Sequence, residues 1–183
     1  IGDKSLSKRD FSRVTVPLEK FGVKFYYKTK NKLPLTILGT QSAKGIKYLE
    51  NRGSAQCKSS IMLAALNASE TTSIKAKKSR DHTELLFKYL KIPIKVRKTK
   101  KFDFIDIKKP KKINAFNYQI PGDISSSAFF MVLTTLADNS KLLIKNVNIN
   151  PSRVGVITIL KKMGAQIILK NQKNYRGEKI SDI

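Results

Sequence analysis

The stretch NRGSAQCKSSIMLAALNASETTSIKAKKSRDHTELLFKYL, residues 51–90, decides the fold of this chain. Small polar residues run directly into an apolar pattern of helical period at 61–66, and a short β-branched segment follows. A second polar start, SRDHTE at 79–84, then opens another helical pattern. Because the first N–H groups of a helix have no intrahelical acceptor, each start is interpreted either as an anion site or as an ordinary N-cap.

This pattern recurs along the chain. IMLAAL (61–66) returns as MVLTTL (131–136), and KYLKIPI (88–94) returns as KKMGAQI (161–167). A partial third copy is PLEKFGVKF (17–25). Each copy is predicted to form a βαβαββ unit of about 70 residues, so the chain holds about two and a half units. Strands that alternate with helices predict an α/β fold with helices packed against sheet faces.

Each copy places an arginine near the start of its second helix, namely Arg9, Arg80 and Arg153. Where that helix ends, Gly22 and Gly164 suit the left-handed conformation of a helix C-terminus. Lys91 stands at the same point of the middle copy, and we expect it to be accommodated differently.

The segment KVRKTKKFDFIDIKK (95–109) alternates well enough to predict two strands joined by a polar turn. Phe102 and Phe104 alternate with acidic residues there, as they would on a packed sheet face. This argues against a platform on which nucleic-acid bases stack.

The charge of the chain is strongly positive. The 183 residues carry 37 Lys and Arg against 13 Asp and Glu, a formal net charge of +24. Such an excess suggests a nucleic-acid partner, but it also fits a biased composition that solvates the surface with lysine. Charge by itself indicates only that anions are attracted.

Cys57 is the one cysteine and His82 the one histidine, which excludes an internal disulfide and a His/Cys zinc cluster. No apolar run approaches the roughly 20 residues that span a bilayer, and the start lacks a signal-peptide pattern. We therefore expect a cytoplasmic protein with no membrane partner and no metal site. Since the chain begins with Ile1, we also expect it to be a piece of a longer protein.

Four motifs, in order, are GSAQCKSSIMLAAL, SRDHTE, IPGDISSSAFF and NPSRVG…LKKMGA. Together with the opening GDKSLSKR and PLEKFG, they closely resemble the 5-enolpyruvylshikimate-3-phosphate synthase family, the 3-phosphoshikimate 1-carboxyvinyltransferases. The resemblance implies an inside-out α/β fold of βαβαββ repeats in two lobes, of which the chain holds part of each. Residues 1–120 would be the latter part of the inserted lobe, and 121–183 the hinge and the first repeat of the second lobe's continuation.

The resemblance implies transfer of the enolpyruvyl group from phosphoenolpyruvate to the 5-hydroxyl of shikimate 3-phosphate, with release of phosphate. It implies no cofactor, no nucleic-acid partner and a monomer at full length. The family's proton-transfer residues would lie outside these 183 residues. The segment is therefore expected to contain no catalytic residue and to show no turnover alone.

The resemblance also implies the binding residues. Ser54, the backbone of Ala55, Gln56 and Arg80 would contact shikimate 3-phosphate, and Gln56 would reach toward phosphoenolpyruvate. Arg9 would bind phosphoenolpyruvate. The simpler interpretation makes Ser54 a plain N-cap and Gln56 a solvated helix residue.

Other residues are given structural roles. Asp10 follows Arg9 where the family usually has Pro, and it could weaken anion binding there. Gly122 and Asp123 are predicted to form a hinge between lobes, and Asp123 or Ser125 can cap the next helix.

Asp81 and Glu84 resemble a capping box that orients its helix. His82 is predicted to face the surface or the hinge, and Cys57 to be a packing residue. Two alternatives stay open: a UDP-N-acetylglucosamine enolpyruvyl transferase of the same fold, and a nucleic-acid-binding protein that uses the lysine excess.

Overall fold

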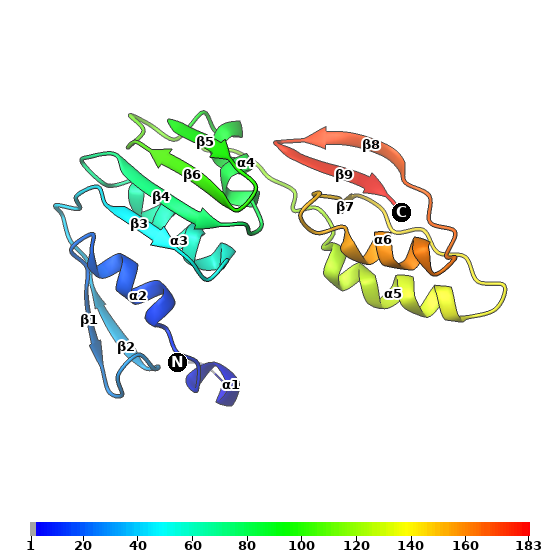
Figure 1. Cartoon of the computed structure of the whole chain (residues 1–183), viewed down its shortest axis with the longest axis horizontal. Coiled ribbons are helices and arrows are strands. Elements are labelled where there is room, and N and C mark those ends of the chain that lie inside the picture. The colour runs from blue at the N-terminus through cyan, green and yellow to red at the C-terminus, as the bar shows by residue number, and fades with distance from the viewer. Residues whose placement is uncertain (1–2) are drawn as a thin grey trace. The chain divides into compact units, whose positions relative to one another are not determined.

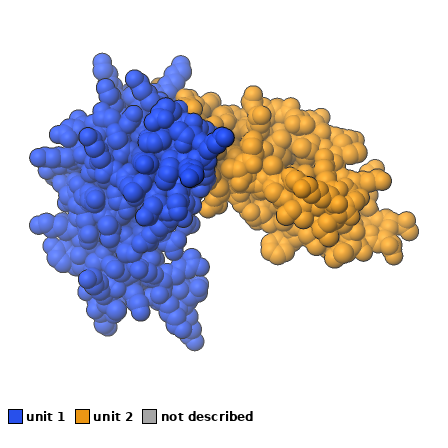
Figure 2. All heavy atoms as spheres, viewed as in Figure 1, with its two compact units in different colours: residues 1–79, 90–113 blue, residues 80–89, 114–183 orange. Residues whose placement is uncertain are grey.

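The computed structural model describes residues 3–183, which fall into two compact units. Unit 1 contains residues 1–79 and 90–113, and unit 2 contains residues 80–89 and 114–183 (Figure 2). Within the described residues, no helix combines the length and the apolar character needed to cross a bilayer.

Unit 1 is built around a four-stranded sheet in the order β3-β4-β6-β5 (Figure 1). Its strands are β3 (Lys47–Glu50), β4 (Thr72–Lys77), β5 (Ile94–Lys98) and β6 (Phe102–Ile107). β3 and β4 run parallel, whereas β4 pairs with β6 and β6 with β5 in antiparallel fashion. The crossover between the two parallel strands is α3 (Ala55–Ala65), which packs against β4. The predicted pairing of two strands within 95–109 is therefore confirmed.

The core of unit 1 lies between α3 and one face of this sheet. Its buried apolar side chains include Cys57, Ile61, Met62, Ala65, Ile74, Ala76, Ile105 and Ile107. The β6 register that buries Ile105 and Ile107 also turns Asp103 inward, because side chains alternate with a period of two. Asp103 is 2% exposed, and Lys78 donates to its carboxylate over 2.7 Å. The prediction that Phe102 and Phe104 lie on the packed face is wrong: both are only partly buried, on the opposite face.

The rest of unit 1 precedes this sheet in the chain. It contains α1 (Lys4–Ser7), α2 (Ser12–Glu19), and an antiparallel pair of β1 (Lys24–Tyr27) with β2 (Leu35–Leu38). α2 packs against α3. A helix followed by two antiparallel strands is the end of a βαβαββ unit, as the partial copy at 17–25 predicts.

Unit 2 repeats the same topology in its own sheet. Its elements after residue 114 are α5 (Ile124–Leu136), β7 (Val147–Asn148), α6 (Gly155–Lys162), β8 (Lys170–Tyr175) and β9 (Glu178–Asp182). The sheet order is β7-β9-β8, and a parallel bridge joins Gly122 to Val147 at the other edge of β7. When Gly122 is counted as a first strand reduced to one bridge, the sheet order of unit 2 matches the order β3-β4-β6-β5 of unit 1. This match confirms the predicted repeat.

The core of unit 2 gathers apolar side chains from α5, α6 and the segment at β7, namely Ile124, Met131, Val147, Ile149, Ile157 and Leu160. α4 (His82–Tyr89) also belongs to this unit and packs against β9. A Cβ atom on Gly177 would lie 2.9 Å from the carbonyl oxygen of Leu85, so glycine permits this close approach.

The three copies turn alike at the end of the second helix. Gly22 has φ of 100° and Gly164 has φ of 96°, as expected. Lys91 also adopts a left-handed conformation, with φ of 57°, so the expectation of a different solution there is wrong. The turn is imposed by the topology of the repeat, and lysine bears the conformational cost.

These turns give a test of stability. Gly164→Ala should lower the free energy of unfolding by about 1 kcal/mol, because alanine disfavours this φ. No atom lies within 4 Å of the added Cβ, so the loss is conformational rather than steric. Lys91→Gly should leave stability unchanged or raise it. Urea unfolding of the complete gene product measures both, and a stabilising Gly164→Ala would contradict the argument.

Candidate functional site

The start of α3 has the geometry of a capped but open helix N-terminus. Ser54 is extended, with φ of −92° and ψ of 110°, and its hydroxyl oxygen accepts the amide of Cys57 over 3.2 Å. The N-cap interpretation of Ser54 is therefore correct, yet the hydroxyl proton is not consumed by this bond. The amides of Ala55 and Gln56 lie in the first turn, where a helix offers them no acceptor. Together these groups can donate to one anion at the helix end.

The turn before Ser54 is held by Glu50, a residue that the sequence analysis did not single out. Glu50 is 2% exposed, and its two carboxylate oxygens accept the amides of Arg52 and Gly53, each over 2.9 Å. Gly53 adopts a φ of 70°, which favours glycine. The signal in the sequence was an acid at the end of β3, two residues before a turn, but nothing local shows that it is buried.

The start of α2 brings further charge to this part of unit 1. The Asp10 carboxylate accepts the amide of Ser12 over 2.7 Å. This backbone hydrogen bond chiefly lowers the pKa of Asp10, with smaller contributions from the positive charges of Arg52 and Arg13. The Asp10 carboxylate is thus engaged in the local turn rather than with Arg9. Arg9 lies on the surface in the same turn, with its amide bonded to the carbonyl of Leu6 over 3.0 Å.

Cys57 is packed in the core of unit 1. Its side chain is buried at 2% exposure, and burial raises the pKa of the thiol above its ordinary value. A neutral, buried thiol is a poor nucleophile, which agrees with the predicted packing role.

Arg80 lies in unit 2, exposed, at the start of the segment that leads into α4. The next two side chains are anchored within the same unit. The Asp81 carboxylate accepts the amide group of Asn150 over 2.8 Å, and His82 Nδ1 lies 2.5 Å from a carboxylate oxygen of Glu178. The prediction of a surface or hinge-facing His82 misses this pairing with Glu178, which only tertiary structure brings close.

The predicted hinge residues form a sheet edge and a helix cap. Gly122 bridges to β7, and Asp123 caps α5 by accepting the amides of Ser125 and Ser126. The guanidinium of Arg153 lies 2.9 Å from Asp123 Oδ1. Partial burial pushes the pKa of Asp123 upward, but these hydrogen bonds and the Arg153 charge outweigh it and lower the pKa. A hinge function for Gly122 and Asp123 stays a prediction.

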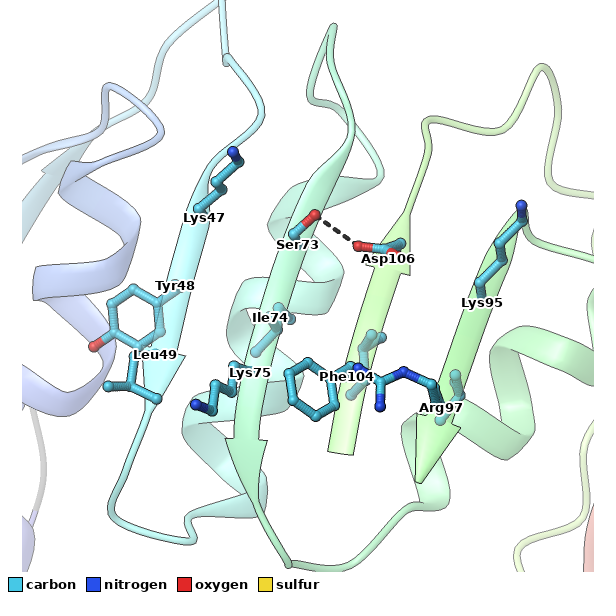
Figure 3. Close-up of a pocket in the computed structure, with 12 residues that line it drawn as sticks. Lys47, Tyr48, Leu49, Ser73, Ile74, Lys75, Lys95, Arg97, Phe104 and Asp106 are labelled. Carbon is cyan, nitrogen blue, oxygen red and sulfur yellow. Dashed lines mark hydrogen bonds between the residues drawn. The ribbon is translucent and has the colours of Figure 1, made fainter. Parts of the chain in front are cut away.

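The outer face of the unit 1 sheet carries a shallow hollow of about 680 Å³, rimmed by basic side chains (Figure 3). The ammonium of Lys75 lies 4.7 Å from the ring centre of Phe102, and the guanidinium of Arg97 lies 4.1 Å from that of Phe104. Both rings are thus approached by cations of the same sheet. We interpret this face as solvated surface, because rings already paired with cations offer little area for a stacked base.

Within residues 3–183, no three side chains of His, Cys, Asp or Glu gather closely enough to hold a metal ion. The predicted binding residues are hydrogen-bond donors and cations: Ser54, Ala55 and Gln56 at the α3 start and Arg9 in unit 1, and Arg80 in unit 2.

Comparison with known proteins agrees with these motifs. Residues 1–181 match the family model of EPSP synthase (3-phosphoshikimate 1-carboxyvinyltransferase). The 3-phosphoshikimate 1-carboxyvinyltransferase of Thermoanaerobacter sp. (strain X514) is 43% identical over 183 residues, which is 100% of this chain and 42% of that protein. The enzyme of the same name from Ruthia magnifica subsp. Calyptogena magnifica is 45% identical over 183 residues, 100% of this chain and 41% of that protein.

Among solved structures, EPSP synthase from Acinetobacter baumannii superimposes with a TM-score of 0.82 at 38% identity. The match covers 100% of this chain and 41% of that one. The predicted fold class is therefore confirmed, while the chain spans about two-fifths of the length of the curated relatives it matches.

The Glu50 interaction can be tested by Glu50→Gln. One amide oxygen cannot accept two backbone N–H groups in this geometry, and the amide nitrogen would face a donor. We expect a loss of about 1–3 kcal/mol in the free energy of unfolding. Glu70→Gln, at an exposed position, is the matched control and should change stability little. Equal effects of the two substitutions in urea unfolding would refute the buried clamp.

The Asp123 cap predicts a pH dependence. Since the folded pKa of Asp123 lies below its ordinary value of 3.8, its contribution is present above about pH 4 and is lost as the pH falls through the folded pKa. Asp123→Ala should cost about 1 kcal/mol at pH 7. The difference from wild type should shrink below pH 3.8. A difference independent of pH in acid unfolding curves would show that the carboxylate charge plays no part.

Proposed function

Because the chain belongs to the EPSP synthase family, we propose that it supplies substrate-binding residues to a 3-phosphoshikimate 1-carboxyvinyltransferase. That enzyme transfers the enolpyruvyl group of phosphoenolpyruvate to the 5-hydroxyl of shikimate 3-phosphate and releases phosphate. The chain spans only 42% of a typical relative, so the activity is proposed for the complete gene product. The observation that carries the proposal is the open start of α3, held in place by Glu50.

The α3 start fits the phosphate of shikimate 3-phosphate. The Ser54 hydroxyl and the amides of Ala55 and Gln56 point donors at the helix end, where the helix dipole also favours negative charge. The dipole contributes about 0.3–1 kcal/mol at an exposed site and up to about 2 kcal/mol when partly buried. The side chain of Gln56 adds a neutral donor that can reach toward phosphoenolpyruvate.

Two arginines complete the proposed set. We assign Arg80 to shikimate 3-phosphate and Arg9 to phosphoenolpyruvate, because a guanidinium binds a carboxylate or phosphate in bidentate fashion. Because its pKa is lowered, Asp10 stays ionised next to Arg9, and the expected weakening of anion binding by Asp10 stays a prediction.

In the proposed reaction the methylene carbon of phosphoenolpyruvate gains a proton, the 5-hydroxyl adds, and phosphate leaves the tetrahedral adduct. We assign none of these proton transfers to residues 3–183, which bind and orient the substrates. We further propose a cytoplasmic monomer that needs no metal or organic cofactor.

The shikimate acceptor is favoured over the UDP-sugar acceptor. The curated relatives named above carry the name of the shikimate 3-phosphate reaction. The nucleic-acid alternative rested on the lysine excess, and the cation-paired rings of the β6 face do not favour it.

Steady-state kinetics of the complete gene product test the proposal. Phosphate should be released from phosphoenolpyruvate with shikimate 3-phosphate and not with UDP-N-acetylglucosamine. Arg80→Lys should raise the KM for shikimate 3-phosphate about tenfold, equivalent to about 1.4 kcal/mol, and leave the KM for phosphoenolpyruvate within twofold. Arg97→Lys, on the outer sheet face, is the control and should behave as wild type. Release of phosphate with the UDP-sugar alone would overturn the assignment.

A further inference from the structure

The segment that carries Arg80 is fastened at the two residues after it. Asp81 is bonded to Asn150, and His82 is bonded to Glu178. The partners are 69 and 96 residues away in sequence, yet all belong to unit 2. Unit 2 therefore fixes the backbone next to Arg80, although the Arg80 side chain is exposed.

The amide of Asn150 can point only one way. Its oxygen accepts the amide of Ser152 over 2.9 Å and the Ser152 hydroxyl over 2.7 Å. Its nitrogen must then face the carboxylates, and it lies 2.8 Å from Asp81 Oδ1 and 3.4 Å from Glu178 Oε2. Because Asn150 is only 2% exposed, water does not compete for these contacts. Asn150 thus links two acidic side chains that would otherwise repel.

Glu178 is the second residue that anchors this segment, through His82. Its carboxylate is 6% exposed, and burial pushes its pKa upward. Hydrogen bonds from His82, Asn148 and Asn150, with the His82 charge, outweigh burial and lower the pKa. The carboxylate therefore stays an ionised acceptor for His82 at neutral pH.

We propose that Asn150 and Glu178 are positioning residues for the binding of shikimate 3-phosphate. Asn150 and Glu178 anchor Asp81 and His82 by hydrogen bonds. This anchoring fixes the backbone of Arg80, whose guanidinium binds the phosphate. This inference rests on the proposed function. An arginine on an anchored backbone loses less conformational freedom on binding than one on a mobile loop, so the anchor increases affinity without touching the ligand.

The test uses the complete gene product with Asn150→Ala. The KM for shikimate 3-phosphate should rise three- to tenfold, while kcat and the KM for phosphoenolpyruvate stay within twofold. Asn174→Ala is the matched control, because Asn174 is an exposed asparagine of β8, in the sheet of unit 2 that also contains Glu178. It should leave all three constants unchanged. An unchanged KM for shikimate 3-phosphate in Asn150→Ala overturns the proposal.

A double-mutant cycle separates positioning from general loss of structure. In an Arg80→Ala background, Asn150→Ala should raise the KM for shikimate 3-phosphate by less than twofold, because the guanidinium it positions is gone. A fully additive effect overturns the proposal. Glu178→Gln keeps an oxygen for His82 and should affect this KM less than Glu178→Ala does.

Asn150→Ala could fail to fold, in which case Asp81→Asn and Asp81→Ala take its place in the same cycle. Asparagine keeps the acceptor for Asn150, so only the alanine variant should raise the KM. Failure of the inference differs from failure of the proposed function. If the proposed function is wrong, the wild type releases no phosphate with shikimate 3-phosphate. If only the inference is wrong, the wild type turns over normally and the KM of the Asn150 variant does not change.

Discussion

The carboxylate of Glu50 accepts hydrogen bonds from the amides of Arg52 and Gly53, and the start of α3 depends on that pair of hydrogen bonds. Once the turn is closed, Ser54 can cap the helix while the amides of Ala55 and Gln56 stay available to a ligand. A buried carboxylate with two backbone donors is costly to disturb, because the Glu50 carboxylate would otherwise be buried without donors. The donors that we propose for shikimate 3-phosphate are therefore set in place before the ligand arrives.

The two repeats share a strand order but differ in the charge of their first helix start. In unit 1 the cap of α3 is the neutral hydroxyl of Ser54, which leaves the positive helix end open to an external anion. In unit 2 the cap of α5 is the carboxylate of Asp123, and Arg153 pairs with it. That start already contains its own anion. One topology thus carries a neutral cap at the start of α3 and a charged cap, paired with an arginine, at the start of α5.

A helix that belongs by sequence to the first repeat is packed with the second. α4 lies between β4 and β5 in the chain, yet it contacts β9, and its first residues join the Asn150 and Glu178 side chains. The polar network there is buried at Asn150 and Glu178, so its members constrain one another strongly. Such a network specifies one arrangement of the segment at Arg80, which a lone surface loop could not do.

The sequence by itself determined the repeat, the paired strands of 95–109, the helix starts and the packing role of Cys57, because these depend on local periodicity and capping. It did not determine the left-handed Lys91, the inward Asp103, the clamp by Glu50 or the network of Asn150 and Glu178. Those follow from strand register and from contacts between residues far apart in the chain. Local propensity cannot anticipate which polar side chain will be buried, since burial is decided only when the distant partner that satisfies it is in place.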